Sequence, residues 1–300
     1  PGLPTSIVIH SGRGTKALVE AAQKGYQGLL SNGYYIDLCQ PAEALYLNDP
    51  LPADSPLNEA QKKLVLGGEA TMWAELVTAE TVDSRIWPRT AAIAERLWSP
   101  QTVCQVDDMY RRLRSVALRL EEQGLAHFKN QDMLFRRLAG TQDIRGLKML
   151  AEAAEPVKNY QRHSQGVTYT SLSPLTRFVD ALFPESLAAR AFRTKVDRFV
   201  KTKDPQLGRE IRAVFLRWRS NHPLVLRLLG QSPALLEIEG LSLALAETCD
   251  TGLAAVESIV ASEAKDDKWA AEKLAALAEA RRPKAHAELA VVTAVEKLVR

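Results

Sequence analysis

The feature that most constrains the fold is a change in hydrophobic pattern near Pro100. Before it, short apolar segments at residues 6–10 (SIVIH), 28–31 (GLLS) and 62–68 (KKLVLGG) alternate with a loop and with stretches of helical character. Such alternation is typical of a parallel sheet with helices on its faces. The pattern therefore predicts an α/β unit over residues 1–100.

After Pro100 the strand signals stop, and apolar residues recur at helical spacing. Leu207, Ile211 and Phe215, for example, repeat every four residues, which places them on one helix face. Breaks rich in Gly, Pro and Asp separate helices of ordinary length. Residues 101–300 are therefore predicted to form an all-helical domain. Four aromatic side chains are expected to be buried between its helices: Phe192, Phe199, Phe215 and Trp218.

Three strand signals are too few for a closed sheet. A (β/α)8 barrel takes about 250 residues, and an open three-stranded parallel sheet leaves edge strands that proteins normally cover. Two arrangements stay open on this pattern alone. Either further strands lie elsewhere, or the sheet is small and is capped by the helices.

Composition and charge argue against several classes of function. The chain has 39 Lys and Arg against 36 acidic residues, and Arg-rich pieces such as residues 111–120 space their charges along helix faces, so nucleic-acid binding is not expected. Cys39, Cys104 and Cys249 show no metal-ligand spacing, so we predict neither a metal site nor a disulfide framework. No apolar run reaches the roughly 20 residues of a membrane span.

Two strand ends carry the residue types that a sugar pocket needs. Tyr35 and Asp37 follow the second strand signal, and Trp73 and Glu75 follow the third. Aromatic rings pack on the apolar face of a sugar, and functional residues gather at the carboxyl ends of parallel strands. Taken alone, Trp73 also suits a core position and Asp37 a loop cap. We predict that the four side chains line one concavity.

The surrounding motifs resemble the β-N-acetylhexosaminidases of glycoside hydrolase family 20. Residues 33–38 (GYYIDL) and 67–76 (GGEATMWAEL) are similar to the ends of that family's last two barrel strands. Residues 83–99 (DSRIWPRTAAIAERLWS) are similar to its final barrel helix. The resemblance implies that residues 1–100 are the last three βα units of a TIM barrel, and that the all-helical domain of residues 101–300 follows them.

The resemblance also implies an activity. Family members hydrolyse terminal β-linked N-acetylhexosamine (GlcNAc or GalNAc) residues of glycans by a substrate-assisted retaining mechanism, without a cofactor. By this resemblance, Tyr35 positions the substrate's acetamido oxygen, Trp73 lines the pocket, and Asp37 and Glu75 bind sugar hydroxyls. A secreted or periplasmic location is also favoured by the resemblance. Further motif residues are interpreted as structural, with the last two expected to anchor the final barrel helix: Trp87, Arg89, Trp98, Glu95 and Arg96.

Two departures from the family pattern matter. The family's catalytic Asp-Glu pair lies on an earlier strand, so we expect the general acid to lie in an N-terminal barrel half, in the same protein or a separate chain. The isolated chain is then expected to be inactive. The second departure is Gly12, which stands where family members commonly carry a tryptophan beside the acetamido group. Glu69 is not expected to replace the missing acid, because it is expected to pair within the barrel. These departures keep a second hypothesis open: a non-catalytic carbohydrate-binding or helical scaffold chain.

Overall fold

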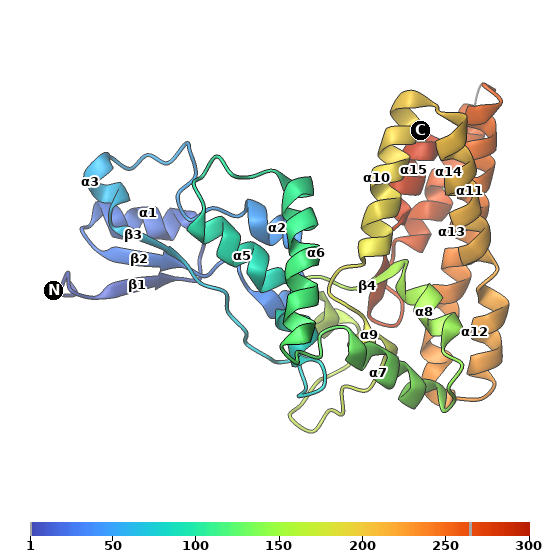
Figure 1. Cartoon of the computed structure of the whole chain (residues 1–300), viewed down its shortest axis with the longest axis horizontal. Helices are drawn as coiled ribbons and strands as arrows, with labels where there is room; N and C mark the ends of the chain where they lie inside the picture. Colours follow the sequence, from blue (N-terminus) through green and yellow to red (C-terminus); the bar gives the residue numbers. More distant parts are fainter. Residues whose placement is uncertain (1, 264–265) are drawn as a thin grey trace. The chain divides into compact units, whose positions relative to one another are not determined.

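The computed structural model describes residues 2–263 and 266–300 and divides the chain into two compact units, residues 1–128 and 129–300 (Figure 1). The hydrophobic pattern predicts a division near residue 100. Helix α6 (Val106–Glu122) instead belongs to the first unit, because its buried residues Met109 and Leu113 share an apolar cluster with helices of that unit. The first unit therefore extends beyond the last strand signal by one long helix.

A three-stranded parallel sheet organises the first unit, in the order β1-β2-β3. Strand β1 (Val8–Ser11) pairs with β2 (Gln27–Leu30), which pairs with β3 (Val65–Gly68). The three predicted strands and their parallel direction are thus confirmed. The other elements of this sheet region are α1 (Thr15–Gln23), the 3-10 turn η1 (Ile36–Leu38), α2 (Ala42–Leu47), α3 (Glu59–Lys62), α4 (Val82–Ile86) and α5 (Arg89–Trp98).

Two separate apolar clusters hold the first unit together. In one cluster, Leu18 of α1 lies against Gly28 of the central strand, where a side chain would collide with it. The absence of a Cβ there lets the helix approach the sheet closely. Leu30, Tyr34, Ile36, Leu45 and Ile93 complete this cluster. The second cluster joins α2, α5 and α6 through Ala42, Tyr46, Ala92, Met109, Tyr110 and Leu113.

The sheet of the first unit keeps open edges and exposed apolar side chains. Among the described residues, β1 and β3 each pair with β2 alone. Ile7, Val8 and Leu66 are exposed, although strands of a parallel sheet are normally buried on both faces. Three strands do not close a barrel, so the TIM-barrel interpretation stays a prediction.

The second unit is helical apart from one short ribbon. Its longer helices are α7 (Lys129–Ala139), α8 (Arg145–Ala151), α10 (Leu187–Thr202), α11 (Pro205–Arg219), α12 (His222–Leu229), α13 (Glu239–Val260), α14 (Asp267–Ala280) and α15 (Val292–Val299). Its short turns are α9 (Phe178–Ala181) and the 3-10 turns η2 (Gln161–Ser164) and η3 (Pro233–Ile238). No helix within residues 2–263 and 266–300 combines the length and apolar character of a bilayer-spanning segment.

The ribbon corrects the prediction of an all-helical domain. Strands β4 (Ala154–Pro156) and β5 (Ala287–Leu289) pair in antiparallel fashion, so that prediction is wrong in this detail. Each strand has three residues, which is too short to show a period of two in the sequence.

One contiguous apolar core fills the second unit. The predicted burial of Phe192, Phe199, Phe215 and Trp218 is confirmed. The Phe192 ring lies 5.1 Å from that of Phe215 and 5.0 Å from that of Trp218, measured between centroids, in edge-to-face contacts. The Trp218 indole N–H donates to Glu152 (3.0 Å), so its polar atom is satisfied.

Candidate active site

Tyr35 and Trp73 lie side by side just past the carboxyl ends of β2 and β3. The pairing of the two strands continues there, since the Ile36 N–H donates to the Thr71 carbonyl (3.0 Å) and the Thr71 N–H donates to the Tyr34 carbonyl (3.1 Å). The rings of Tyr35 and Trp73 stand 6.3 Å apart between centroids at an interplanar angle of 88°. Because the Trp73 side chain is also 59% exposed, it does not take the core position that it suits when considered alone.

Asp37 and Glu75 form a second pair in the same region. Their carboxyl groups lie close enough to interact electrostatically. Burial, and then the Glu75 carboxyl, raises the pKa of Asp37 to about 6, against the opposing effect of the backbone amides of Asp37 and Ala74. Ala74 itself adopts φ 65°, a left-handed conformation that is uncommon for a residue with a side chain.

The candidate group is open to solvent. Trp73 is 59% exposed, Glu75 is exposed, and Tyr35 and Asp37 are half-buried. The Oδ1 atom of Asp37 is buried and has no hydrogen-bond partner among the described residues, so it can accept a hydrogen bond from a ligand. An aromatic face, a phenol and two carboxyl groups together suit a polyhydroxyl molecule with one apolar face.

Gly12, directly after β1, lies beside this group. A Cβ atom at position 12 would stand 2.7 Å from Tyr35 Oη and 3.8 Å from Ser31 Oγ. Any side chain there would therefore press on the Tyr35 hydroxyl. Glu69 has a different role, since its Oε1 lies 2.8 Å from Nε2 of His10. The expected pairing of Glu69 within the sheet region is confirmed.

Residues 3–101 match a protein-family model described as "Glycosyl hydrolase family 20, catalytic domain". The first third of the chain is therefore similar to the catalytic domain of this family. A solved structure, the X-ray structure of a Flavobacterium johnsoniae chitobiase, is similar with a TM-score of 0.91 and 36% sequence identity, over 99% of this chain and 46% of that one. The helical unit of this chain thus also has a counterpart in that structure.

Curated relatives of the family 20 stretch include both types of β-hexosaminidase subunit. The chain is 38% identical over 112 residues to β-hexosaminidase subunit beta of Mus musculus, covering 36% of this chain and 20% of that protein. It is 35% identical over 113 residues to subunit alpha of Bos taurus, covering 37% and 21%. The chain therefore spans about a fifth of the length of these relatives. The suspected resemblance to family 20 is confirmed.

Within the first unit, Arg89 holds the loop that carries Asp37. Arg89 begins α5 and is buried. Its guanidinium donates to the carbonyls of Ile36 (2.6 Å), Gln40 (2.7 Å) and Arg85. Because Ile36 and Gln40 bracket Asp37, this clamp fixes the loop beside the candidate site. Sequence reasoning interpreted Arg89 as structural and missed this link, since the WPR motif does not reveal which carbonyls the guanidinium meets.

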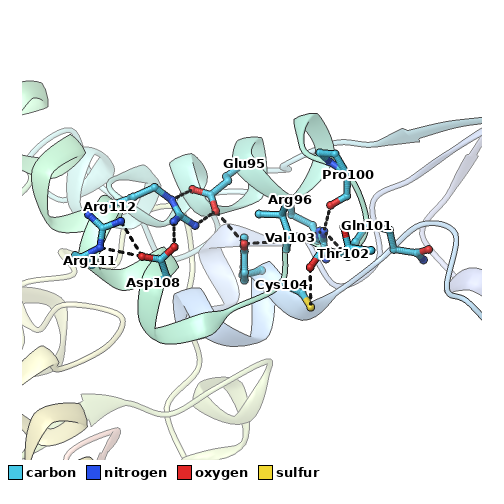
Figure 2. Close-up of polar contacts among 11 residues, drawn as sticks. Glu95, Arg96, Pro100, Gln101, Thr102, Val103, Cys104, Asp108, Arg111 and Arg112 are labelled. Atoms are coloured by element: carbon cyan, nitrogen blue, oxygen red, sulfur yellow. Dashed lines mark hydrogen bonds and ion pairs between the residues drawn. The ribbon is translucent and has the colours of Figure 1, made fainter.

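Glu95 and Arg96 anchor α5, as predicted (Figure 2). The Glu95 carboxylate accepts a hydrogen bond from Nε of Arg112 on α6 (2.9 Å), and Arg112 also pairs with Asp108. The Arg112 guanidinium holds the pKa of Glu95 below its usual value. The Arg96 guanidinium donates to the Val103 carbonyl (3.0 Å). The final helix of the family 20 stretch is thereby tied to α6 and to the loop between them.

The exposure of Trp98 corrects the prediction that this motif residue is structural. Its side chain is 92% exposed and belongs to neither apolar cluster of the first unit, so its assignment as a structural residue is wrong for the described part of the chain. Trp87, by contrast, is half-buried. A large apolar side chain in a motif suggests burial, but burial depends on neighbours that the motif does not specify.

Proposed function

We propose that this chain forms the substrate-binding part of a β-N-acetylhexosaminidase. The enzyme would hydrolyse terminal β-linked N-acetylhexosamine residues of glycans by a substrate-assisted retaining mechanism. The observation that supports this best is the grouping of Tyr35 with Trp73, and of Asp37 with Glu75, past the carboxyl ends of two neighbouring parallel strands. The match of residues 3–101 to family 20 adds to it.

In the proposed mechanism, Tyr35 orients the nucleophile. The oxygen of the substrate's own acetamido group attacks the anomeric carbon, and the bond to the leaving oxygen breaks as an external acid protonates that oxygen. A cyclic oxazolinium ion forms, which water then opens with net retention. The Tyr35 O–H would donate to the acetamido oxygen and hold it in line with the anomeric carbon. Such orientation is worth several kcal/mol in favourable cases.

The remaining three residues would bind the sugar ring. Trp73 offers a 59% exposed indole, against which the apolar C–H face of a pyranose can pack. The free Oδ1 of Asp37 would accept a hydrogen bond from a ring hydroxyl. Glu75, whose carboxyl group interacts with that of Asp37, would accept a second one. Together these contacts fix which face of the sugar meets Tyr35.

The general acid is proposed to come from outside residues 1–300. No Asp-Glu dipeptide occurs anywhere in this sequence, although the family resemblance implies such a pair on an earlier strand. Unpaired edges at β1 and β3 and the exposed Ile7, Val8 and Leu66 favour further strands that cover this sheet. The proposed partner is therefore the N-terminal half of the barrel, in the same protein or in a separate chain.

Release of 4-nitrophenol from 4-nitrophenyl N-acetyl-β-glucosaminide tests this proposal. The chain alone should show no turnover above buffer, and addition of the complementary barrel half should restore it. In the complete enzyme, Tyr35→Phe should lower kcat by about 10²–10³ with a smaller effect on KM, because its hydrogen bond strengthens in the transition state.

Tyr26→Phe is the matched control, since the Tyr26 hydroxyl donates to the Leu3 carbonyl (2.7 Å), and its removal should leave kcat unchanged. Robust turnover by the chain alone would contradict the external acid. A complete enzyme that binds N-acetylglucosamine without cleaving the substrate would favour the carbohydrate-binding hypothesis instead.

A further inference from the structure

We propose that a cavity in the second unit binds a small zwitterion, an α-amino acid with an aliphatic side chain. The cavity has a volume of about 330 Å³, near the lower end of the usual size range of ligand pockets. Four charged side chains line it: Glu155, Arg193, Arg281 and Glu288. The proposed site lies outside the family 20 stretch and does not depend on the glycosidase function.

The cavity lies where α10, the β4-β5 ribbon and the start of α15 meet. Helices α10 and α15 pack against each other (Figure 1). Arg193 comes from α10, and Glu155 and Glu288 come from the two strands of the ribbon. The register places Glu155 directly opposite Glu288, so both carboxyl groups stand on the same face of the ribbon and reach the same cavity.

Two of the four charges are already paired within the chain. The Glu155 carboxylate accepts hydrogen bonds from the Lys158 ammonium (2.7 Å) and the Ser186 N–H (2.8 Å). The Arg281 guanidinium donates to the Glu296 carboxylate (2.5 Å). These two charges therefore need no partner from a ligand.

Glu288 and Arg193 remain, with one charge of each sign. The nearest cation to Glu288 in the described part of the chain is the Lys158 ammonium, 4.0 Å from Oε1, which is beyond hydrogen-bonding distance. Arg193 donates through Nη1 to the Ala290 carbonyl (3.0 Å), and its nearest carboxylate is Glu155, at 4.0 Å. Glu288 and Arg193 do not pair with each other among the described residues, so both can meet a ligand.

The carboxyl group of Glu288 suits the ammonium end of such a ligand. Burial raises the pKa of Glu288, the Lys158 ammonium opposes that rise, and the facing Glu155 adds to it. Like charges directly opposite each other in a β-ribbon are destabilising. A ligand ammonium beside Glu288 would offset this repulsion and supply the close cation that the chain does not.

The other parts of the ligand would meet the remaining walls. The free donors of Arg193 suit the ligand's carboxylate, because a guanidinium can form two parallel hydrogen bonds with a carboxylate. The Thr293 hydroxyl has no partner among the described residues and can also donate to the ligand. Leu289, Ala290 and Val292 complete the cavity, and their apolar character suits an aliphatic side chain.

Isothermal titration calorimetry with L-leucine tests the proposal on the whole chain of residues 1–300. Isopentylamine lacks the carboxylate of leucine, and isocaproate lacks its ammonium. Both should bind more weakly than L-leucine by about tenfold or more, because each loses hydrogen bonds between charged groups. Glu288→Gln should weaken L-leucine binding by about tenfold and leave isocaproate binding unchanged, whereas Arg193→Gln should weaken L-leucine binding and leave isopentylamine binding unchanged.

Glu272→Gln is the matched control, because Glu272 lies on α14, is exposed and is not among the described residues that line the cavity. It should leave all three affinities unchanged. Absence of L-leucine binding at millimolar concentration would overturn the proposal, and so would equal binding of the three compounds. L-Leucine binding that survives Glu288→Gln undiminished would overturn it as well. The analogue series needs no variant, so a variant that fails to fold leaves the proposal testable.

Discussion

The two compact units bury their apolar residues in different ways. The second unit, residues 129–300, closes its helices around one contiguous core that contains Phe192, Phe215 and Trp218. The first unit, residues 1–128, has two smaller clusters and leaves Val8 and Leu66 exposed on its sheet. The unit that carries the candidate site is thus the one whose buried apolar residues do not form one contiguous core. We expect the second unit to be stable by itself and the first to depend more on polar anchors and on whatever covers its sheet.

The largest expected effect is in the second unit. Trp218→Ala should lower its stability by about 3–5 kcal/mol, because it opens a cavity beside Phe192 and leaves Glu152 without the indole donor. Scanning calorimetry of the whole chain should show a fall of roughly 6–20 °C in one unfolding transition. The transition of the first unit should not move. A loss below about 1 kcal/mol would break the comparison, since the single core would then not govern the stability of this unit.

A smaller effect is expected from the polar anchor of the first unit. Arg89→Met should cost about 1–3 kcal/mol, because the carbonyls of Ile36 and Gln40 lose their buried donor. Urea unfolding followed by tryptophan fluorescence measures the loss. Binding of N-acetylglucosamine by the completed enzyme should weaken as well, since the loop around Asp37 is released. Unchanged stability and unchanged binding together would show that the clamp is dispensable.

The pH dependence of the first unit should sharpen the comparison further. The pKa of Asp37 in the folded chain, about 6, lies above its ordinary value of 3.8, so the folded state holds this proton more tightly than the unfolded state. Stability is therefore lost as pH rises from about 4 through 6 and Asp37 ionises beside Glu75. Asp37→Asn, which stays neutral, should raise the melting temperature of the first unit above pH 7 and have no such effect near pH 4.

Melting curves recorded between about pH 4 and 8 check this expectation. Asp83→Asn is a suitable control because the Asp83 carboxylate accepts a hydrogen bond from the Ala126 N–H (2.8 Å) and shows no comparable pair with a second acid in the described residues. A stabilisation by Asp37→Asn that is equal at every pH would contradict the raised pKa of Asp37.

The smallest effect is expected at Trp98. Trp98→Ala should change stability by less than about 0.5 kcal/mol in the isolated chain, because the side chain is 92% exposed. The same urea experiment measures it, and Trp218→Ala provides the contrast for the loss of an indole. A loss of several kcal/mol would mean that the first unit buries more than its two clusters. In the completed enzyme a larger loss is expected only if the added barrel half covers this residue.

The sequence predicted those parts of the molecule that depend on local hydrophobic patterns. The three strands followed from short apolar runs between helical stretches, and the buried aromatic residues of the second unit followed from the period of 3.6. The pairing of Glu69 followed from its place at the end of a strand. The packing of α6 in the first unit could not be predicted, because an amphipathic helix face does not indicate which element it packs against. The contact between Gly12 and the Tyr35 hydroxyl also escaped, since it joins two loops that only the sheet register brings together.

The clamp formed by Arg89 has a consequence for how the specificity of this site can change. It grips main-chain carbonyls at Ile36 and Gln40, and every amino acid carries such a carbonyl. Positions 37 and 38 can therefore be randomised without removing an acceptor that the guanidinium uses. Cys39 is more restricted, since its φ of 56° favours glycine or asparagine. Natural or laboratory evolution can thus change the side chains that contact the sugar while the hydrogen bonds from Arg89 keep the loop in place.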